Sequence, residues 1–173
     1  MSESIAFEEW MVDEGPATPA LGVAIGPAVE VRNLTWKSSG RVAKYLQAPY
    51  MRDSALAFHE FGAAFQYPYG TGLNWNALDD WIRDEYWFGA AEEYLIVVYQ
   101  ADVLLAEDPD GFSIFVESAS GFWADYWRLE AEPKVRFRVL FHVEHAAASL
   151  LASRLEHVNA VWQGVDFPRS RPA

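Results

Sequence analysis

The stretch that most constrains the fold is Leu95–Tyr99, which reads LIVVY and contains no charged residue. A strand with one face in water alternates apolar and polar residues, whereas a strand covered by helices on both faces is apolar throughout. Two more strands are predicted where such alternation occurs, at Ala28–Trp36 (AVEVRNLTW) and Val135–Glu144 (VRFRVLFHVE). Helical patterns separate these strands, and strands joined by helical crossovers pair in parallel.

The clearest helical pattern is Asp53–Phe65, where Asp53 or Ser54 can cap the helix and three phenylalanines form one apolar stripe. Further helices are predicted over residues 75–87, 111–130 and 146–157. Gly121 leaves open whether residues 111–130 form one broken helix or two short ones.

These patterns predict an α/β fold in which a small three-stranded parallel sheet is packed with helices through right-handed crossovers. A chain of 173 residues with 51% hydrophobic residues suits one compact domain with modest additions. We expect an N-terminal extension over residues 1–27, the domain over 28–145, and a C-terminal helix and tail over 146–173. Within the domain, Gly40–Gln47 is expected to begin a helix that Pro49 interrupts.

The formal charge of −12 is concentrated in two segments. Residues 1–14 contain five acidic residues and no Lys or Arg, and residues 74–93 contain six acidic residues against Arg83 alone. Such a charge disfavours binding to nucleic acid or to an anionic membrane, and it favours a cationic partner. The chain has no cysteine, no signal-peptide pattern and no apolar run long enough to span a bilayer, so a cytoplasmic location is expected.

Neither a metal nor a cofactor is expected. His142 and His145 straddle a strand end, a spacing that does not aim both rings at one ion. The Gly70–Gly72 segment precedes a helix but lacks the Lys and Ser or Thr of a phosphate-binding loop, so a tight turn explains its glycines. Asp80 and Asp84 lie side by side on a helix rather than across a cleft, which argues against a glycosidase. We therefore expect a protein that is not an enzyme.

The predicted helix 75–87, capped by Asn74, is strongly amphipathic. At about 100° per residue, the apolar side collects Trp75, Leu78, Ile82 and Tyr86. The opposite side, expected to face outward, collects Asn76, Asp79, Asp80, Arg83 and Asp84. Two interpretations stay open: a solvated acidic helix face, or a surface for a cationic partner, since clustered acids repel one another.

The stretch FQYPYGTGLNWNALDDWI, with its core at Tyr69–Ile82, resembles the signature of the barstar family, the protein inhibitors of barnase-type ribonucleases. An aromatic–Gly turn, Tyr69-Gly70, precedes Asn74 and the helix that follows it. The resemblance implies a three-stranded parallel sheet packed with helices. It also implies that this helix and the loop before it plug a ribonuclease active site.

The resemblance further implies roles for single residues. Asp80 would lie where a substrate phosphate lies, Tyr69 or Tyr67 would cover the catalytic base, and an acid of the later helix, assigned to Glu130, would add a contact. The implied partner-binding set is Tyr67, Tyr69, Asn74, Asn76, Asp79, Asp80, Arg83 and Asp84.

The chain departs from the family pattern at three places. Thr71–Leu73 lengthens the loop, Asn76 stands where the family usually has Asp, and Asp79 stands where the best-known member has Trp. The function expected from this resemblance is inhibition, of the immunity or antitoxin type, of a secreted or toxic ribonuclease. The alternatives are a barstar-like module for a basic partner that is not a nuclease, and a carbohydrate-binding or carbohydrate-hydrolysing protein that uses exposed Trp.

Overall fold

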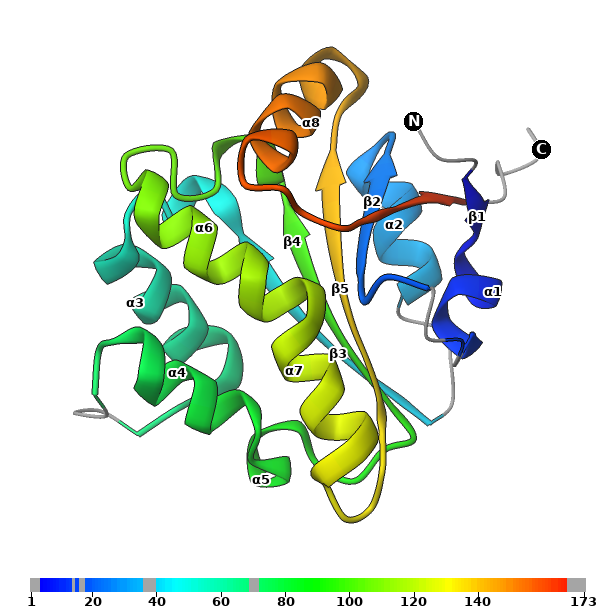
Figure 1. Ribbon diagram of the computed structural model, residues 1–173, viewed down its shortest axis with the longest axis vertical. Coiled ribbons are helices and arrows are strands. Elements are labelled where there is room, and N and C mark those ends of the chain that lie inside the picture. The colour runs from blue at the N-terminus through cyan, green and yellow to red at the C-terminus, as the bar shows by residue number, and fades with distance from the viewer. Residues whose placement is uncertain (1–3, 14, 16–17, 36–39, 69–71, 168–173) are drawn as a thin grey trace.

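The computed structural model describes residues 4–13, 15, 18–35, 40–68 and 72–167 (Figure 1). Its centre is a six-stranded, all-parallel sheet in the order β1-β6-β2-β5-β4-β3. The strands are β1 (Ile5–Ala6), β2 (Leu21–Ile25), β3 (Arg41–Gln47), β4 (Glu93–Tyr99), β5 (Arg136–Val143) and β6 (Gln163–Asp166). The α/β class, the parallel pairing and the strands at β4 and β5 are therefore confirmed.

The expected number of three strands is wrong, because both terminal segments add strands to the sheet. Strands β1 and β2 come from residues 1–27, and β6 comes from residues 146–173. Strand β2 pairs with β5 over its full length, from Leu21 opposite Val139 to Ile25 opposite Val143. The domain boundaries at 28 and 145 stay a prediction, but the segments outside them belong to the same sheet.

Two neighbouring predictions are wrong, because the structure has a helix where a strand was predicted and a strand where a helix was predicted. Residues Ala28–Thr35, predicted as a strand, form helix α2, and Arg41–Gln47, expected to begin a helix, forms β3. The alternation in the first segment rests on Val29 and Val31 alone, and the helix buries Val31 while Val29 stays 52% exposed. Strand β3 is set by pairing with β4 along all seven residues, a long-range contact that local patterns do not report.

Most of the other helices lie where the sequence predicts helix. They are α1 (Phe7–Val12), α2, α3 (Ser54–Phe65), α4 (Trp75–Ile82), α5 (Glu85–Phe88), α6 (Pro109–Glu117), α7 (Trp123–Asp125) and α8 (Ala148–His157). Asp53 caps α3 by accepting a hydrogen bond from the Leu56 amide. The predicted helix over 111–130 continues past Gly121, because a π-helical turn at Ser118–Phe122 joins α6 to α7. A second π-helical turn at Tyr126–Glu130 extends α7, so that α6 and α7 form one rod with these turns.

The helices cover the sheet on both faces (Figure 1). The larger layer, made by α3, α4, α6, α7 and α8, packs on Tyr94, Ile96 and Val98 of β4. On the other face, α1 and α2 pack on Leu95 and Val97. Because β4 is buried on both faces, its side chains are apolar at nearly every position, which confirms the interpretation of the LIVVY run.

At their amino ends the three strands β3, β4 and β5 are joined by two ion pairs that share one glutamate. Glu93 of β4 lies opposite Arg41 of β3 and opposite Arg136 of β5. Its carboxylate accepts from Arg41 Nε at 2.7 Å and from Arg136 Nη2 at 3.0 Å. The Arg41 and Glu93 side chains are only 1% and 8% exposed, so each charge depends on the other for the hydrogen bonds it loses to water.

Gly22 of β2 lies where α1 and β6 meet the sheet. A Cβ atom at this position would lie 2.7 Å from Trp10 Cζ2 and 2.8 Å from Val165 Cγ2. The Trp10 ring is fully buried, and its Nε1 donates to the Pro19 carbonyl at 2.9 Å. The absent side chain at Gly22 therefore makes room for the contact between the two terminal segments of the sheet.

Candidate partner-binding surface

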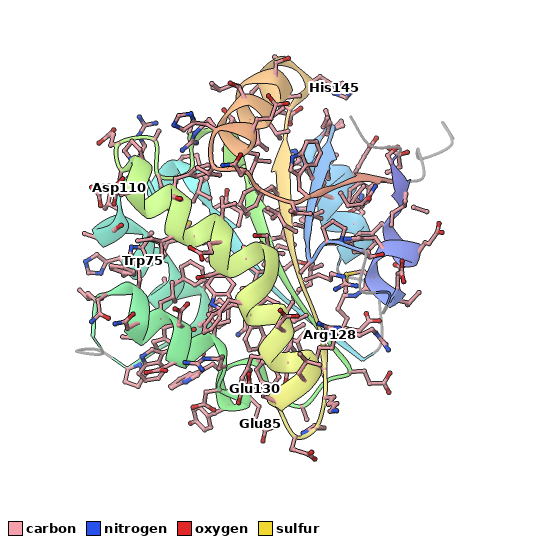
Figure 2. The ribbon with its side chains drawn as sticks, in the orientation of Figure 1. Trp75, Glu85, Asp110, Arg128, Glu130 and His145 are labelled. Carbon is pink, nitrogen blue, oxygen red and sulfur yellow. The ribbon has the colours of Figure 1, made fainter. Side chains whose placement is uncertain are left out.

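Helix α4 begins as the sequence predicts. Asn74 has extended backbone angles, and its Oδ1 accepts a hydrogen bond from the Ala77 amide at 2.9 Å, which makes it the N-cap. Leu78 and Ile82 are buried in the larger core. Trp75, labelled in Figure 2, meets Phe58 edge to face with ring centroids 5.0 Å apart. The apolar side of this helix therefore anchors it to α3.

The predicted helix 75–87 is broken at Arg83–Asp84. Asp84 has an extended backbone and caps the short α5, because its Oδ1 accepts from the Tyr86 amide at 3.0 Å. This break changes the phase of the side chains that follow it. Tyr86, expected on the buried side, is 77% exposed, so that prediction is wrong.

Asp79 does not face outward as expected. Its Oδ1 accepts a hydrogen bond from Nε1 of the fully buried Trp123 at 2.8 Å and from Ser118 Oγ at 3.4 Å. The carboxylate therefore joins α4 to the rod made by α6 and α7. The Asp79 carboxylate thus has a structural role and is not among the carboxylates that α4 presents to solvent.

Asp80 is the exposed acid of α4, with 76% of its side chain in solvent. Its Oδ1 forms an ion pair with Arg83 Nη2 at 2.7 Å. The Arg83 Nε also donates to the Asp79 carbonyl at 3.1 Å. Its guanidinium lies over the rings of Phe122 and Tyr126, 5.2 and 5.4 Å from their centroids. Arg83 is thus held in place next to the acid that the sequence singles out.

Phe122 and Tyr126 are functional candidates that the sequence interpretation missed. The sequence assigned no role to the aromatic residues of 111–130 beyond membership of a predicted helix, and in the structure Phe122 is 47% exposed. The sequence feature that could have indicated the contact of Arg83 with Phe122 and Tyr126 is Arg83 itself. It is the one cation among six acids in residues 74–93, at i, i+3 from Asp80.

Tyr67 lies beneath the α4–α5 junction rather than projecting from it. Its ring lies 4.8 Å from that of Trp81 and 5.2 Å from that of Trp87. Among the described residues its hydroxyl has no hydrogen-bond partner. Burial, with the charge of Asp84, raises the pKa of Tyr67 well above its usual value. Tyr69, the other aromatic expected to reach a partner, lies outside the described residues.

The predicted site residues therefore separate into two groups. Asn76, Asp80, Arg83 and Asp84 form the first group, and we call them, together with the neighbouring Glu85, which was not predicted, the acidic face; four of these five are exposed and Arg83 is half-buried. Asp79 and Tyr67 support this face from below, and Asn74 caps the helix that carries it. Glu130, at the end of the α6–α7 rod, is exposed, and Figure 2 labels it and Glu85 near the lower edge of the molecule.

The described part of the chain has no group of three or more His, Asp or Glu side chains placed to hold a metal ion. His142 is fully buried, and its Nε2 lies 2.7 Å from the Gly26 carbonyl. Its Nδ1 accepts a hydrogen bond from the Gln100 amide at 3.4 Å. Both ring nitrogens therefore contact backbone groups of residues that directly follow strands, Gly26 after β2 and Gln100 after β4. None of the helices described has the length and apolarity that a bilayer-spanning segment needs.

A comparison with known protein families shows which family the chain belongs to. Residues 42–142, more than half of the chain, match the family described as Barstar (barnase inhibitor). The chain belongs to the barstar family. The matched residues run from β3 to β5 and include the acidic face, and the members of this family are inhibitors rather than enzymes. No curated protein matches the chain.

The chain was also compared with solved structures, and the similarities have low sequence identity. The Aeropyrum pernix ORC2 protein, in its ADPNP–ADP complexes, aligns with a TM-score of 0.50 and 10% identity over 84% of this chain and 41% of that one. CDC6P from Pyrobaculum aerophilum aligns with a TM-score of 0.49 and 17% identity, over 83% and 38% of the two chains. The chain thus spans about two fifths of these larger proteins. The likeness to the ORC2 protein concerns the fold alone.

Proposed function

We propose that this barstar-family protein inhibits a microbial ribonuclease by inserting its acidic face into the enzyme's active site. The observation that carries the proposal is the position of Asp80. It lies in the family-matched segment, on a helix capped by Asn74 and anchored by Trp75, and three quarters of its side chain is in solvent. A rigid helix therefore presents one carboxylate outward.

The chemistry of a ribonuclease explains why such a carboxylate suits inhibition. An enzyme that cleaves RNA holds phosphate with Lys, Arg and His, so its active site is cationic. Asp80, Asp84 and Glu85 supply negative charge at one place, and complementary potentials speed the encounter and discriminate against wrong partners, as the barnase–barstar pair itself illustrates. Inhibition then needs only occupation of the site, without any chemistry by the inhibitor.

Arg83 makes this face different from a purely acidic one. In the free protein its guanidinium already occupies one side of the Asp80 carboxylate. A partner's cation must share that carboxylate with Arg83 or displace it. We expect the partner to offer an acceptor, such as a carboxylate or a backbone carbonyl, within reach of Arg83.

The experiment is a titration of the protein into a barnase-class ribonuclease while RNA cleavage is followed. We expect loss of cleavage at one-to-one stoichiometry, with the inhibition constant weakened at least 100-fold by Asp80→Asn, since hydrogen-bonded charge pairs at interfaces contribute several kcal/mol. Asp125→Asn is the matched control. Asp125 is also exposed and pairs with an arginine three residues on, Arg128, at the same 2.7 Å. Equal inhibition by the wild type and Asp80→Asn would contradict the assigned surface.

A second candidate function is binding of a basic partner that is not a nuclease. Two observations favour it: Asp79 is turned inward to Trp123, and Arg83 neutralises part of the Asp80 charge. The acidic face therefore carries less negative charge than the sequence indicates. Capture of a basic protein without nuclease activity, lost in Asp80→Asn and kept in Asp125→Asn, would favour this candidate.

A further inference from the structure

Arg83 is the one residue of the acidic face whose charge a cationic active site repels. The face combines three acids, Asp80, Asp84 and Glu85, with this single cation. A site that holds phosphate is positive, so at equal distance it opposes a guanidinium as strongly as it attracts a carboxylate. A favourable contribution of Arg83 to binding therefore requires a negative group on the partner.

The Arg83 side chain is fixed in place, so a partner that reaches Asp80 also meets the guanidinium. Its Nε donates to the Asp79 carbonyl at 3.1 Å, and its Nη2 donates to Asp80 Oδ1 at 2.7 Å. The same group lies over the rings of Phe122 and Tyr126, 5.2 and 5.4 Å from their centroids. Contacts with both α4 and the α6–α7 rod restrict this side chain more than the ion pair alone does.

The fixed guanidinium still has donors that a partner can reach. A guanidinium carries five N–H groups, and in the described residues neither N–H of Arg83 Nη1 has an acceptor. The enclosed side-chain atoms without a partner belong to Tyr67, Trp87 and Tyr99, so Nη1 is accessible to solvent. A partner that covers this face removes solvent from Nη1 and has to supply an acceptor, because an unpaired buried donor is costly.

The charge balance favours a carboxylate as that acceptor. In the described chain Asp80 is the one carboxylate that pairs with Arg83. When a cation of the partner also pairs with Asp80, two positive groups share one negative group in a site that excludes water, which is unfavourable. The neighbouring Asp84 already holds the Tyr86 amide. A carbonyl would satisfy the N–H groups alone, whereas a carboxylate also balances the charge and matches the planar guanidinium with two parallel hydrogen bonds.

We propose that Arg83 is the specificity-determining residue of the acidic face, and that it forms an ion pair with a carboxylate of the target ribonuclease beside the cations that bind Asp80. Ribonucleases that carry this carboxylate are bound. Those whose active site is cationic throughout are rejected, because Arg83 repels them. The inference rests on the proposed inhibitor function and adds the chemistry by which the inhibitor selects its partner.

The test measures inhibition constants of the wild type, Arg83→Met and Arg83→Lys against a panel of barnase-class microbial ribonucleases. Methionine keeps an apolar stem over the two rings and removes the charge, whereas lysine keeps the charge without the planar fork. For the ribonuclease that the wild type inhibits most strongly, we expect Arg83→Met to weaken inhibition about 20-fold and Arg83→Lys to recover only part of this loss. Equal or tighter inhibition of that ribonuclease by Arg83→Met would overturn the proposal.

Arg128→Met is the matched control for the loss of one positive charge. Arg128 pairs with Asp125, three residues earlier, at the same 2.7 Å that joins Arg83 to Asp80. Arg128, labelled in Figure 2, lines a hollow beside Phe137 of β5, and no described residue of the acidic face lines that hollow. We expect Arg128→Met to inhibit within about twofold of the wild type. An equal loss in Arg128→Met and Arg83→Met would assign the effect to net charge and overturn the proposal.

A double-mutant cycle identifies the group that pairs with Arg83. Each Asp or Glu in the active-site cleft of the same ribonuclease is changed in turn to its amide. Binding of the wild type and of Arg83→Met is then measured by calorimetry, which does not depend on the activity of the ribonuclease variant. We expect one carboxylate whose loss weakens binding of the wild type about 20-fold and leaves binding of Arg83→Met unchanged. A cleft in which no carboxylate is coupled to Arg83 would overturn the proposal.

The weakly inhibited members of the panel test the rejection. Arg83→Met should inhibit them about tenfold more strongly than the wild type does, because the repulsion is removed. Inhibition that depends on Asp80 but nowhere on Arg83 would overturn this inference and leave the proposed function in place. Absence of inhibition by both the wild type and Arg83→Met across the panel would contradict the proposed function itself, and this inference with it.

Discussion

Asp79 and Asp80 are neighbours in sequence with opposite roles in the structure. Asp79 accepts a hydrogen bond from a buried indole, whereas Asp80 stays mostly in solvent beside Arg83. The helical period places both on one broad arc, and only the position of Trp123, 44 residues away, distinguishes them. The sequence could therefore predict the acidic helix but could not predict which of its acids face outward.

This difference predicts contrasting effects on stability. Asp79→Ala should lower the free energy of unfolding by about 1–3 kcal/mol, because it leaves the Trp123 N–H buried without an acceptor. Asp80→Ala should change it by no more than about 0.5 kcal/mol, the usual contribution of an exposed ion pair. Urea unfolding measures both values, and Asp79→Asn, which keeps an acceptor oxygen, is the control. An equal loss in the two alanine variants would contradict the inward role of Asp79.

Alkaline pH should destabilise the protein through its buried phenols. The folded state keeps Tyr99 protonated up to about pH 12, whereas the unfolded chain loses that proton near pH 10. Between these values the unfolded state binds fewer protons, so the free energy of unfolding falls as the pH rises. Urea midpoints at pH 9, 10 and 11 test this: Tyr99→Phe should reduce the fall, and Tyr50→Phe, at a residue 66% exposed, should not.

At the scale of elements, the sequence predicted the helices and strands that are set by contacts between residues close together in the chain. The caps at Asp53 and Asn74, the apolar β4 and the alternating β5 were all found from the sequence. The exchange of helix and strand between α2 and β3 has a non-local cause, because β3 is defined by its pairing with β4, about 50 residues further on. Strand β6 buries one side chain, Val165, and offers too short a pattern to predict.

Substitution of two glycines, one in a helix and one in a strand, should change the free energy of unfolding in opposite directions. Gly121 lies in the α6–α7 rod, and a Cβ atom there would meet no atom within 4 Å. Gly121→Ala should therefore raise the free energy of unfolding by about 0.5–1 kcal/mol through helix propensity. Gly22→Ala should lower it by about 1–3 kcal/mol, because the new methyl group overlaps the Trp10 and Val165 side chains. Thermal or urea unfolding measures both, and a stabilising Gly22→Ala would contradict the close packing described.

At the scale of the molecule, the family match and the fold have different extents. The match ends within β3 and β5, whereas the sheet continues through β2, β6 and β1. Trp10 and Met11 of α1 cover Leu95, Val97 and Leu140 on one face of the shared strands. The flanking segments are therefore part of the core rather than additions to it.

We predict that a fragment of residues 40–145 does not fold, although it contains the family-matched region. It would expose Leu95, Val97 and Leu140, each fully buried in the whole chain, and leave β5 with an unpaired edge. Circular dichroism and thermal unfolding should show no cooperative transition. A chain of residues 1–158, which keeps β2 and α8 but lacks β6, should fold with lower stability. Cooperative unfolding of the 40–145 fragment would show that the flanking strands are dispensable.

The pairing of β1 has a consequence for how the protein is made. In the described chain β1 has β6 as its single neighbour, with Ile5 opposite Val165. A ribosome delivers the amino-terminal segment first, and domains usually begin to fold in that order. Here β1 has to wait until Val165 of β6 has been synthesised before it can pair. The sheet is therefore completed only after the helix that carries Asp80 has already emerged.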